Sequence, residues 1–317
     1  MKTRQFGNTD LFITPITFGA WEIGGEPFYK NMPENDSIAL ITGAYELGVN
    51  FFDTAPVYGF GHSERVLGKA IKKFRDKIVI STKCGLCWKE NSIAAIYKDA
   101  SKKSILGEID ESRKRLDTDV IDLYLVHWPD ENTPIGQTIE TLESIKAQGK
   151  IKHYGLSNFT TLQIKEAAAY GSISALQSPY SMMNLKLENS ELPYCIENRI
   201  GFQAYSPLHR GVLTDKTIEA LRESGQPAIN WILDSMTVEK TQQVLDIKEV
   251  SMSYGVSFAS FVTAWTITQP GITTAIIGTT KMQHIKEAVE GTLITINTED
   301  ALTIRNIIKE GNEHGQK

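Results

Sequence analysis

The sequence predicts a single closed (β/α)8 barrel, the TIM-barrel architecture, over residues 1–317, with an N-terminal hairpin and an extra C-terminal helix. Short apolar strands alternate with amphipathic helical segments, and neither repeats nor linkers interrupt them, which favours a parallel sheet. The Gly-x-Gly-x-x-Gly of an open dinucleotide-binding sheet is missing after the first strand, which favours closure. In such barrels the chemistry is placed at the carboxyl ends of the strands.

Turn residues and helical periodicity predict the individual elements. Turn residues within positions 1–14 indicate the hairpin that closes the bottom of the barrel. We expect Ser63 and Thr133 to cap the second and fourth helices, and helical spacing from Ile105 to Leu116 predicts the third. The strands are expected at 15–19, 50–53, 78–83, 120–127, 153–157, 174–177, 201–205 and 273–278, with helices near 35–48, from 281 and near 299–309. Two long connections, 84–100 and about 206–237, are expected to be functional.

Composition and charge exclude several classes of function. A net charge of −5 and a pI near 5.8 give no reason to expect a nucleic acid or an anionic membrane as partner. The first residues lack the apolar core of a signal peptide, and no apolar run approaches the ~18 residues of a membrane span. With three cysteines, an odd count that fits a reducing compartment, the sequence predicts a cytoplasmic protein.

The Cys84-Gly85-Leu86-Cys87 segment has the spacing of a redox pair or of half a zinc site. A second cysteine pair is missing, and no helix is expected to start at the motif. We therefore interpret both residues as loop thiols and expect no metal site.

Polar residues follow three successive strands where each one ends. Asp53 ends the second strand and Tyr58 follows it by five residues, while Lys83 and His127 end the next two. A tyrosine donates a proton efficiently near neutral pH only if about 4 kcal/mol of differential stabilisation lowers its pKa from about 10. We expect the Lys83 ammonium to supply this, Asp53 to hold Lys83, and a neutral His127 to orient a substrate carbonyl group.

Three motifs carry a resemblance to a known family. They are Phe52-Asp53-Thr54-Ala55 with Tyr58-Gly59 and Ser63-Glu64, then Leu123-Tyr124-Leu125-Val126-His127-Trp128-Pro129, and Gly149-Lys150-Ile151-Lys152 before Gly155-Leu156-Ser157-Asn158-Phe159. Along nearly its whole length the chain resembles the aldo-keto reductase superfamily, and it looks most similar to bacterial reductases of the class that includes inositol-operon and general-stress members. The resemblance implies an NAD(P)H-dependent oxidoreductase that reduces carbonyl groups reversibly, with Tyr58 as the general acid and base.

The resemblance also implies a nicotinamide cofactor bound without an open dinucleotide-binding sheet. Ser157, Asn158 and Gln177 would hold its carboxamide, Tyr205 would stack on its ring, and a helix N-terminus after Gly278 suits a phosphate. The positions that match cofactor contacts are Gly19, Ala20, Trp21, Asp53, Ser157, Asn158, Gln177, Tyr205, Ser206, Leu208, Gly211, Gly278, Thr279, Thr280, Lys281, His284 and Glu287.

The chain departs from the family at the last of these sites. His284 stands where relatives that prefer NADP often have an arginine, and Ala288 stands where an asparagine is usual. Lys281 still offers a cation for a 2′-phosphate, so NADP(H) is favoured over NAD(H).

The expected partner is a small carbonyl compound or sugar, bound by a monomer or a weak homo-oligomer. Aromatic side chains suit a flat aldehyde or a sugar face. The residues expected to border the substrate are Trp21, Tyr58, Trp88, His127 and Trp128, with Phe28 and Tyr29 nearby.

Two other functions fit parts of the pattern. In a class I aldolase Lys83 would form a Schiff base, but this leaves Ser157, Asn158 and Gln177 without a task. In a cofactor-sensing module of the potassium-channel β-subunit type, the barrel would bind the cofactor in order to regulate a partner. Multiple turnover would count against the second alternative.

Overall fold

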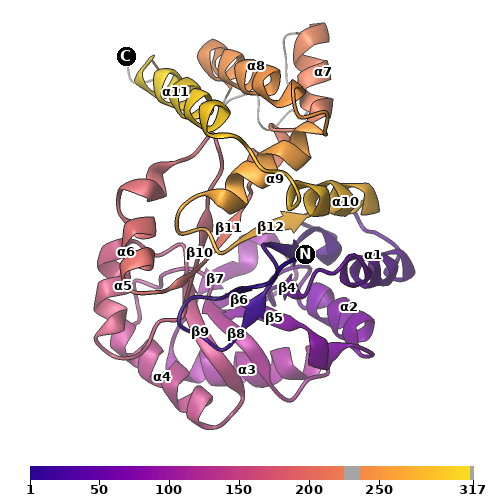
Figure 1. Cartoon of the computed structure of the whole chain (residues 1–317). Helices are drawn as coiled ribbons and strands as arrows, with labels where there is room; N and C mark the ends of the chain where they lie inside the picture. The colour runs from indigo at the N-terminus through magenta and orange to yellow at the C-terminus, as the bar shows by residue number, and fades with distance from the viewer. Residues whose placement is uncertain (225–235, 315–317) are drawn as a thin grey trace.

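The computed structural model confirms a closed parallel barrel and describes residues 1–224 and 236–314. Hydrogen bonds join its eight strands in the order β10-β11-β12-β3-β4-β5-β8-β9, and helices surround them (Figure 1). The barrel strands are β3 Ile16–Gly19, β4 Phe51–Asp53, β5 Val79–Cys84, β8 Ile121–Val126, β9 Ile151–Ser157, β10 Ala175–Pro179, β11 Gly201–Tyr205 and β12 Thr274–Gly278. All eight predicted strands are present.

Eleven α-helices lie in the described part of the chain. They are α1 Glu34–Glu46, α2 His62–Ile71, α3 Lys102–Leu116, α4 Ile135–Ala147, α5 Thr161–Ala168, α6 Glu191–Glu197, α7 Asp215–Ser224, α8 Val238–Met252, α9 Phe258–Thr268, α10 Met282–Gly291 and α11 Thr298–His314. The predicted C-terminal helix, α11, packs against α8, and α8 also contacts α7 (Figure 1). Short 3-10 segments are η1 Glu22–Gly24, η2 Arg75–Lys77, η3 Ile93–Ala95, η4 Lys186–Asn189 and η5 His209–Gly211.

The predicted N-terminal hairpin is formed by β1 Arg4–Gln5 and β2 Phe12–Ile13. Its buried Phe6 packs edge-on against Phe51 of β4, with ring centroids 5.8 Å apart, in an apolar cluster separate from the main core. This cluster includes the barrel residues Val79, Leu123 and Leu125. The hairpin therefore closes one end of the barrel and leaves the other end, here called the mouth, for polar residues.

Two predicted helix caps are wrong. Helix α2 begins at His62 after Gly61, and the Ser63 hydroxyl instead donates to the Ala20 carbonyl oxygen at 2.6 Å. Thr133 donates to Asp130 at 2.7 Å, while α4 begins after Pro134 without a side-chain cap. In both cases the hydroxyl donates to an acceptor in a loop instead of capping the helix: Ser63 to a residue distant in the chain, and Thr133 to a residue three positions earlier.

The connection after β5 is a hairpin rather than an irregular loop. Strands β6 Leu86–Trp88 and β7 Ile96–Lys98 pair antiparallel in it. The other long connection, about 206–237, contains η5 and α7, and its residues 225–235 lie outside the described part.

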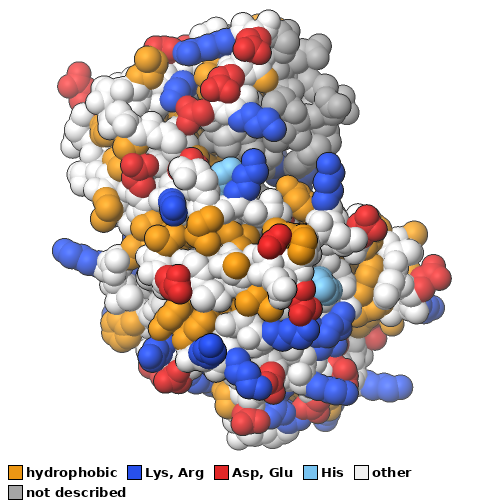
Figure 2. Space-filling model, turned by 90° about the vertical axis from the view of Figure 1, so that its right-hand side faces the viewer, with side chains coloured by type: hydrophobic (Ala, Val, Ile, Leu, Met, Phe, Trp, Pro, Cys, Tyr) orange, Lys and Arg blue, Asp and Glu red, His pale blue; other side chains and the backbone are white. Residues whose placement is uncertain are grey.

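The surface carries charges of both signs. Figure 2 looks onto the side of α1, α2, α7 and α10, where acidic and basic side chains alternate without a large field of one sign. Among the described residues, no helix has the length and apolar character that a membrane crossing needs.

Candidate active site

Three strand ends bring the predicted catalytic residues together at the mouth. Asp53 is the last residue of β4 and lies in register with Ser81 of β5. Lys83, two residues later in β5, lies in register with Leu125 of β8, and His127 follows β8 directly. Side chains at alternate positions of a strand point the same way, so this register directs the polar groups of adjacent strands to one place.

A buried ion pair forms the base of this site. The Nζ atom of Lys83 lies 2.8 Å from Oδ2 of Asp53, and it also donates to the Thr54 carbonyl oxygen at 2.8 Å. Oδ1 of Asp53 accepts hydrogen bonds from Ser81 at 2.6 Å and from Gln177 at 2.9 Å. Burial lowers the pKa of Lys83, and Asp53 opposes that change. Both charged groups therefore have polar partners that hold them in one geometry.

Tyr58 stands beside this pair, on the turn that follows β4. The Nζ atom of Lys83 is 3.5 Å from its hydroxyl and 5.1 Å from its ring centroid. The pKa of Tyr58 is nonetheless raised well above its usual value, first by burial and then by the charges of Asp53 and Glu22. The expected lowering by Lys83 is therefore not found, because burial outweighs the ammonium charge and Asp53 offsets that charge. Tyr58 is a phenol that holds its proton.

His127 faces Tyr58 across the mouth and is buried. Their ring centroids are 5.8 Å apart and the ring planes stand at 81°. Burial, followed by the Lys83 charge, lowers the pKa of His127 well below its usual value. The imidazole is therefore neutral at physiological pH, as the sequence predicted, and one ring nitrogen can donate a hydrogen bond without competing with Tyr58 as proton source.

A second buried carboxylate, which the sequence analysis quoted in a motif without assigning it a role, lies behind Lys83. Glu64 of α2 accepts hydrogen bonds from Thr82 at 2.6 Å and from Arg115 of α3 at 2.5 Å. The Glu64 side chain is fully buried, so Arg115 supplies the charge that its burial requires. The pair fixes α2 and α3 against β5, next to Lys83.

Most of the residues expected at a nicotinamide form one hydrogen-bonded cluster of polar side chains on β9, β10 and β11 and the residues that follow them. Asn158 donates to the His127 carbonyl oxygen and to Ser157, both at 3.0 Å, and accepts from the Tyr205 hydroxyl at 2.8 Å. Its φ of 65° is a left-handed conformation that is uncommon outside glycine and occurs at functional sites. Gln177 links this group to Asp53.

Two buried polar atoms near this cluster have no hydrogen-bond partner within the described chain. They are Nε2 of Gln203, in β11, and Oε2 of Glu22, in η1. Gln203 otherwise accepts from Gln177 at 3.2 Å. Buried polar groups are normally paired, so unpaired ones at a mouth fit a site that a polar ligand completes.

The residues expected near the cofactor phosphates lie on two segments that also share the mouth. After β11, Ser206, His209 and Arg210 have positive φ values of 54°, 46° and 57°, which concentrates strain in this loop. After β12, the segment from Gly278 leads to the N-terminus of α10, where no side chain caps the helix. A helix N-terminus without such a cap suits an anion.

The two residues of the second segment that could carry a positive charge, Lys281 and His284, lie in different environments. The Thr279 hydroxyl lies 2.7 Å from Nδ1 of His284 and accepts the Lys281 backbone N–H at 3.0 Å. Burial and then Lys281 lower the pKa of His284, so its ring adds no positive charge at neutral pH. Lys281 is exposed and charged, and Glu287 is bonded to Gln283 at 3.2 Å.

Most of the aromatic residues expected to border the substrate contact one another or other rings near the Tyr58 turn. Trp21 contacts Tyr29 with ring centroids 5.9 Å apart, and Phe60 contacts Phe28 at 5.9 Å and Trp88 at 5.5 Å. Trp128 is 40% exposed, with Nζ of Lys98 5.9 Å from its ring centroid. Half-exposed aromatic rings near a buried polar cluster suit an organic ligand.

The two cysteines of the Cys-x-x-Cys segment are free thiols in different settings. Cys84 ends β5 and is buried, while Cys87 lies in β6 within 3.1 Å of the Ser104 hydroxyl. Burial raises the pKa of both thiols, that of Cys87 to about 12, so neither forms a thiolate at neutral pH. The described residues include no cluster of His, Cys, Asp or Glu that could hold a metal ion.

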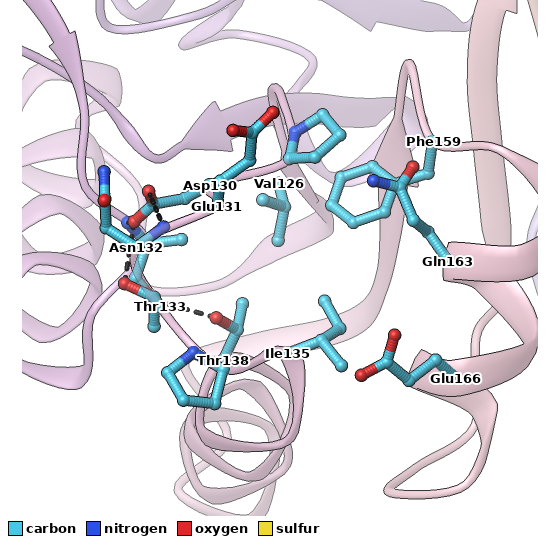
Figure 3. Close-up of a pocket in the computed structure, with 13 residues that line it drawn as sticks. Val126, Asp130, Glu131, Asn132, Thr133, Ile135, Thr138, Phe159, Gln163 and Glu166 are labelled. Carbon is cyan, nitrogen blue, oxygen red and sulfur yellow. Dashed lines mark hydrogen bonds between the residues drawn. The ribbon is translucent and has the colours of Figure 1, made fainter.

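A separate cavity of about 340 Å³ lies between the loop after β8 and α5 (Figure 3). It contains none of the four predicted catalytic residues. Asp130 on its wall accepts hydrogen bonds from the backbone N–H groups of Ala100 and Asn132 and from Thr133, so it holds the loop in place. The cavity follows from the shape of this loop and is distinct from the cluster of predicted catalytic residues at the mouth.

Sequence reasoning missed three polar residues of the site: Glu22, Glu64 and Gln203. A glutamine in the middle of the apolar segment 201–205 is a signal that could have found Gln203. Glu22 sits in a Gly-rich loop, where an acidic residue is normally solvated, so nothing in the local sequence indicates its burial.

The chain is similar to known proteins both in sequence and in structure. The model of a family described as "Aldo/keto reductase family" matches residues 15–309. The chain is 34% identical to "Aldo-keto reductase YhdN" of Bacillus subtilis over 98% of this chain and 94% of that one, and 32% identical to the "NADH-specific methylglyoxal reductase" of Escherichia coli over 97% and 98%. The solved structure of a glycerol dehydrogenase from Gluconobacter oxydans matches with a TM-score of 0.88 at 27% identity, over 98% of this chain and 96% of the other.

The buried ion pair generates a prediction about stability. Asp53→Asn leaves the Lys83 ammonium buried without its carboxylate, and we expect it to lower the free energy of unfolding by about 3 kcal/mol or more. Lys83→Met should cost less, because Asp53 keeps Ser81 and Gln177 as donors. The double variant Asp53→Asn/Lys83→Met should be more stable than Asp53→Asn alone.

Chemical denaturation of all four proteins at neutral pH measures these differences. Additive losses in the double variant would show that the two groups are not energetically coupled.

Proposed function

Because this chain belongs to the aldo/keto reductase family, we propose that it is an oxidoreductase that reversibly reduces the carbonyl group of a small aldehyde, ketone or sugar with a nicotinamide cofactor. The cluster of Asp53, Lys83, Tyr58 and His127 is the observation that carries this proposal. It combines a neutral acid, a fixed cation and a neutral hydrogen-bond donor at one strand-end site. When bound, the cofactor supplies or accepts the hydride.

Each protein group has a distinct part in the proposed reaction. Tyr58 holds a proton in the resting site and gives it to the carbonyl oxygen during reduction, or takes it from the alcohol during oxidation. Lys83 stabilises the phenolate that this transfer leaves, and Asp53 keeps Lys83 in position. Neutral His127 donates a hydrogen bond to the same oxygen and so orients it.

The cofactor would be held by the chain's own polar groups at the mouth. Ser157, Asn158 and Gln177 would bind its amide, Tyr205 its ring, and the segments after β11 and β12 its phosphates. Two orphaned polar atoms, an uncapped helix N-terminus and a strained loop in one region support the fit.

We propose NADP(H) as the favoured cofactor, through Lys281. The relative from Escherichia coli is named NADH-specific, so the choice has to come from residues of this chain. His284 is neutral, and Lys281 is therefore the cation of the segment that begins α10. One ammonium can make a charge-assisted contact with a 2′-phosphate.

The aldolase alternative conflicts with the position of Lys83. Its side chain is fully buried, and Nζ already donates to Asp53 and to Thr54 at 2.8 Å each. A Schiff-base lysine needs a free amine that a carbonyl carbon can reach. The sensing alternative predicts cofactor binding without turnover, and the activity measurement below separates it from the reductase.

Tyr58→Phe tests the proposed function directly. We expect it to lower kcat by at least ~10²-fold, the range of positioned acid catalysis, with cofactor affinity nearly unchanged. The measurement is the oxidation of NADPH and NADH, followed by absorbance, with a panel of aldehydes, ketones and sugars. A wild-type protein without multiple turnover would contradict the reductase, and a variant with more than half of the wild-type activity would exclude Tyr58 as the acid.

His127 gives a second prediction, because an orienting donor need not titrate. Glutamine keeps an N–H donor of similar reach, so His127→Gln should retain far more activity than His127→Ala. The pH dependence of reduction should be the same in His127→Gln as in the wild type, since the lowered pKa of His127 keeps the ring neutral. Equal inactivity of the two variants, or an acidic limb that vanishes with glutamine, would make His127 the proton donor.

Lys281→Ala tests the cofactor preference. Loss of a charge-assisted hydrogen bond should weaken NADPH binding by about 1.5–3 kcal/mol, and NADH binding much less. Lys286→Ala, which removes an exposed lysine from the same helix, is the matched control and should change neither affinity. If both cofactors lose equal affinity in Lys281→Ala, Lys281 does not discriminate between them.

A further inference from the structure

Glu22 is an acidic residue that the proposed reaction does not use, although it lies at the reaction site. It begins η1, which packs on the Tyr58 turn: a Cβ on Gly24 would come within 2.7 Å of the Tyr58 backbone. A Cβ on Gly278, at the end of β12, would lie 2.5 Å from both carboxylate oxygens of Glu22. The Glu22 carboxyl group therefore covers the strand end that leads to α10.

One oxygen of this carboxyl group is shielded from water and lacks a hydrogen-bond partner. Oε2 of Glu22 is buried and has no hydrogen bond within the described chain, although the residue as a whole is partly exposed. Burial raises the pKa of Glu22 to about 7, and its own backbone N–H only partly opposes this. Near neutral pH the group is therefore divided between a neutral and a charged form.

The charged and titratable groups around Glu22 leave it uncompensated. Tyr58 and Tyr29 face it, and its charge helps to raise the pKa of each. Asp53 ends the neighbouring β4, and beyond Gly278 stand Lys281 and the neutral His284. None of the cations in the described chain forms an ion pair with Glu22.

We propose that Glu22 binds the phosphate segment of the dinucleotide as a neutral carboxylic acid that donates a hydrogen bond, so that cofactor binding takes up one proton. This rests on the proposed function, which places the phosphates on the segment after β12. Gly278 has no side chain to separate the carboxyl group from that segment, and the N-terminus of α10 draws the anion to it.

Two properties of a bound phosphate favour the neutral form of Glu22: its negative charge and its need for hydrogen-bond donors. An ionised Glu22 would lie beside the phosphate anions, and like charges at short range in a partly buried site repel strongly. An ionised carboxylate also has only acceptors, whereas a carboxylic acid has one O–H donor for a phosphate oxygen. A donor of this kind to a charged acceptor makes a short, strong hydrogen bond.

The consequence is a defined pH dependence of affinity. The bound state keeps the proton, so the pKa of Glu22 is higher with cofactor than without it. Affinity is then constant below the pKa of the free protein and falls as pH rises above it, by up to tenfold per pH unit. With that pKa at about 7, NADH should bind roughly tenfold more weakly near pH 8 than near pH 6.

The experiment measures the dissociation constant of NADH by fluorescence or calorimetry between about pH 6 and about pH 8.5, without any activity readout. NADH is the probe because the 2′-phosphate of NADPH itself titrates near pH 6 and would add its own pH dependence. In Glu22→Gln the amide keeps an N–H donor and cannot ionise. Its affinity should vary less than about twofold over this range and match that of the wild type at low pH.

Glu108→Gln is the matched control. Burial raises the pKa of Glu108 to about 7 as well, but this residue binds the Gly85 backbone and Ser104, away from the cofactor segments. It should keep the full pH dependence of the wild type. Calorimetry in two buffers of different ionisation enthalpy near pH 8 should show uptake of close to one proton per NADH in the wild type and none in Glu22→Gln.

Different contrary results would contradict the Glu22 inference and the proposed function. Wild-type affinity that does not change with pH, or a Glu22→Gln variant that binds weakly at every pH, overturns the inference, since the second result would make Glu22 an ionised acceptor. A pH dependence that Glu108→Gln abolishes also overturns it. If neither NADH nor NADPH binds at any pH, the proposed function itself fails and the inference fails with it.

Discussion

The buried contact between Lys83 and Asp53 is the interaction on which the rest of the site depends. Taking an ammonium and a carboxylate out of water costs several kcal/mol for each ion unless their remaining hydrogen-bonding capacity is satisfied. Here the partners are Thr54, directly after β4, Ser81 in β5 and Gln177 in β10. Only a closed barrel in the observed register brings these strands together. The geometry of the site therefore depends directly on the fold.

The same ion pair sets the protonation of its neighbours. Lys83 alone would favour the ionised forms of nearby acids, but Asp53 at 2.8 Å offsets most of its charge at longer range. Burial then dominates, so Tyr58 keeps its proton and His127 stays neutral. The sequence places an ammonium near a phenol, yet it does not give the desolvation of that phenol. This is why the predicted direction of the Tyr58 pKa was opposite to the one in the structure.

The barrel and the four residues at its mouth were predictable because strand alternation and strand ends are local features of the sequence. Contacts made by the loops between elements were not predictable from the sequence. Ser63 and Thr133 have the chemistry of helix caps, but their hydroxyl groups bind the Ala20 carbonyl oxygen and Asp130, which come from other elements or from the preceding loop. The burial of Glu22 likewise depends on two turns that touch: a Cβ on Gly59 would lie 1.9 Å from the carbonyl oxygen of Gly24.

The polar groups of the mouth fall into two sets: those that have hydrogen-bond partners within the chain and those that lack them. Asp53 and Lys83, to which we assign parts in the proposed chemical step, have their hydrogen-bond partners within the chain itself, so the proposed reaction requires little reorganisation. Oε2 of Glu22 and Nε2 of Gln203 have none in the described chain, and a buried unpaired polar group costs about 1–3 kcal/mol. A polar ligand that pairs with such groups recovers that free energy only in the folded state. Ligand binding should therefore stabilise the fold through these groups while the geometry of the ion pair stays fixed.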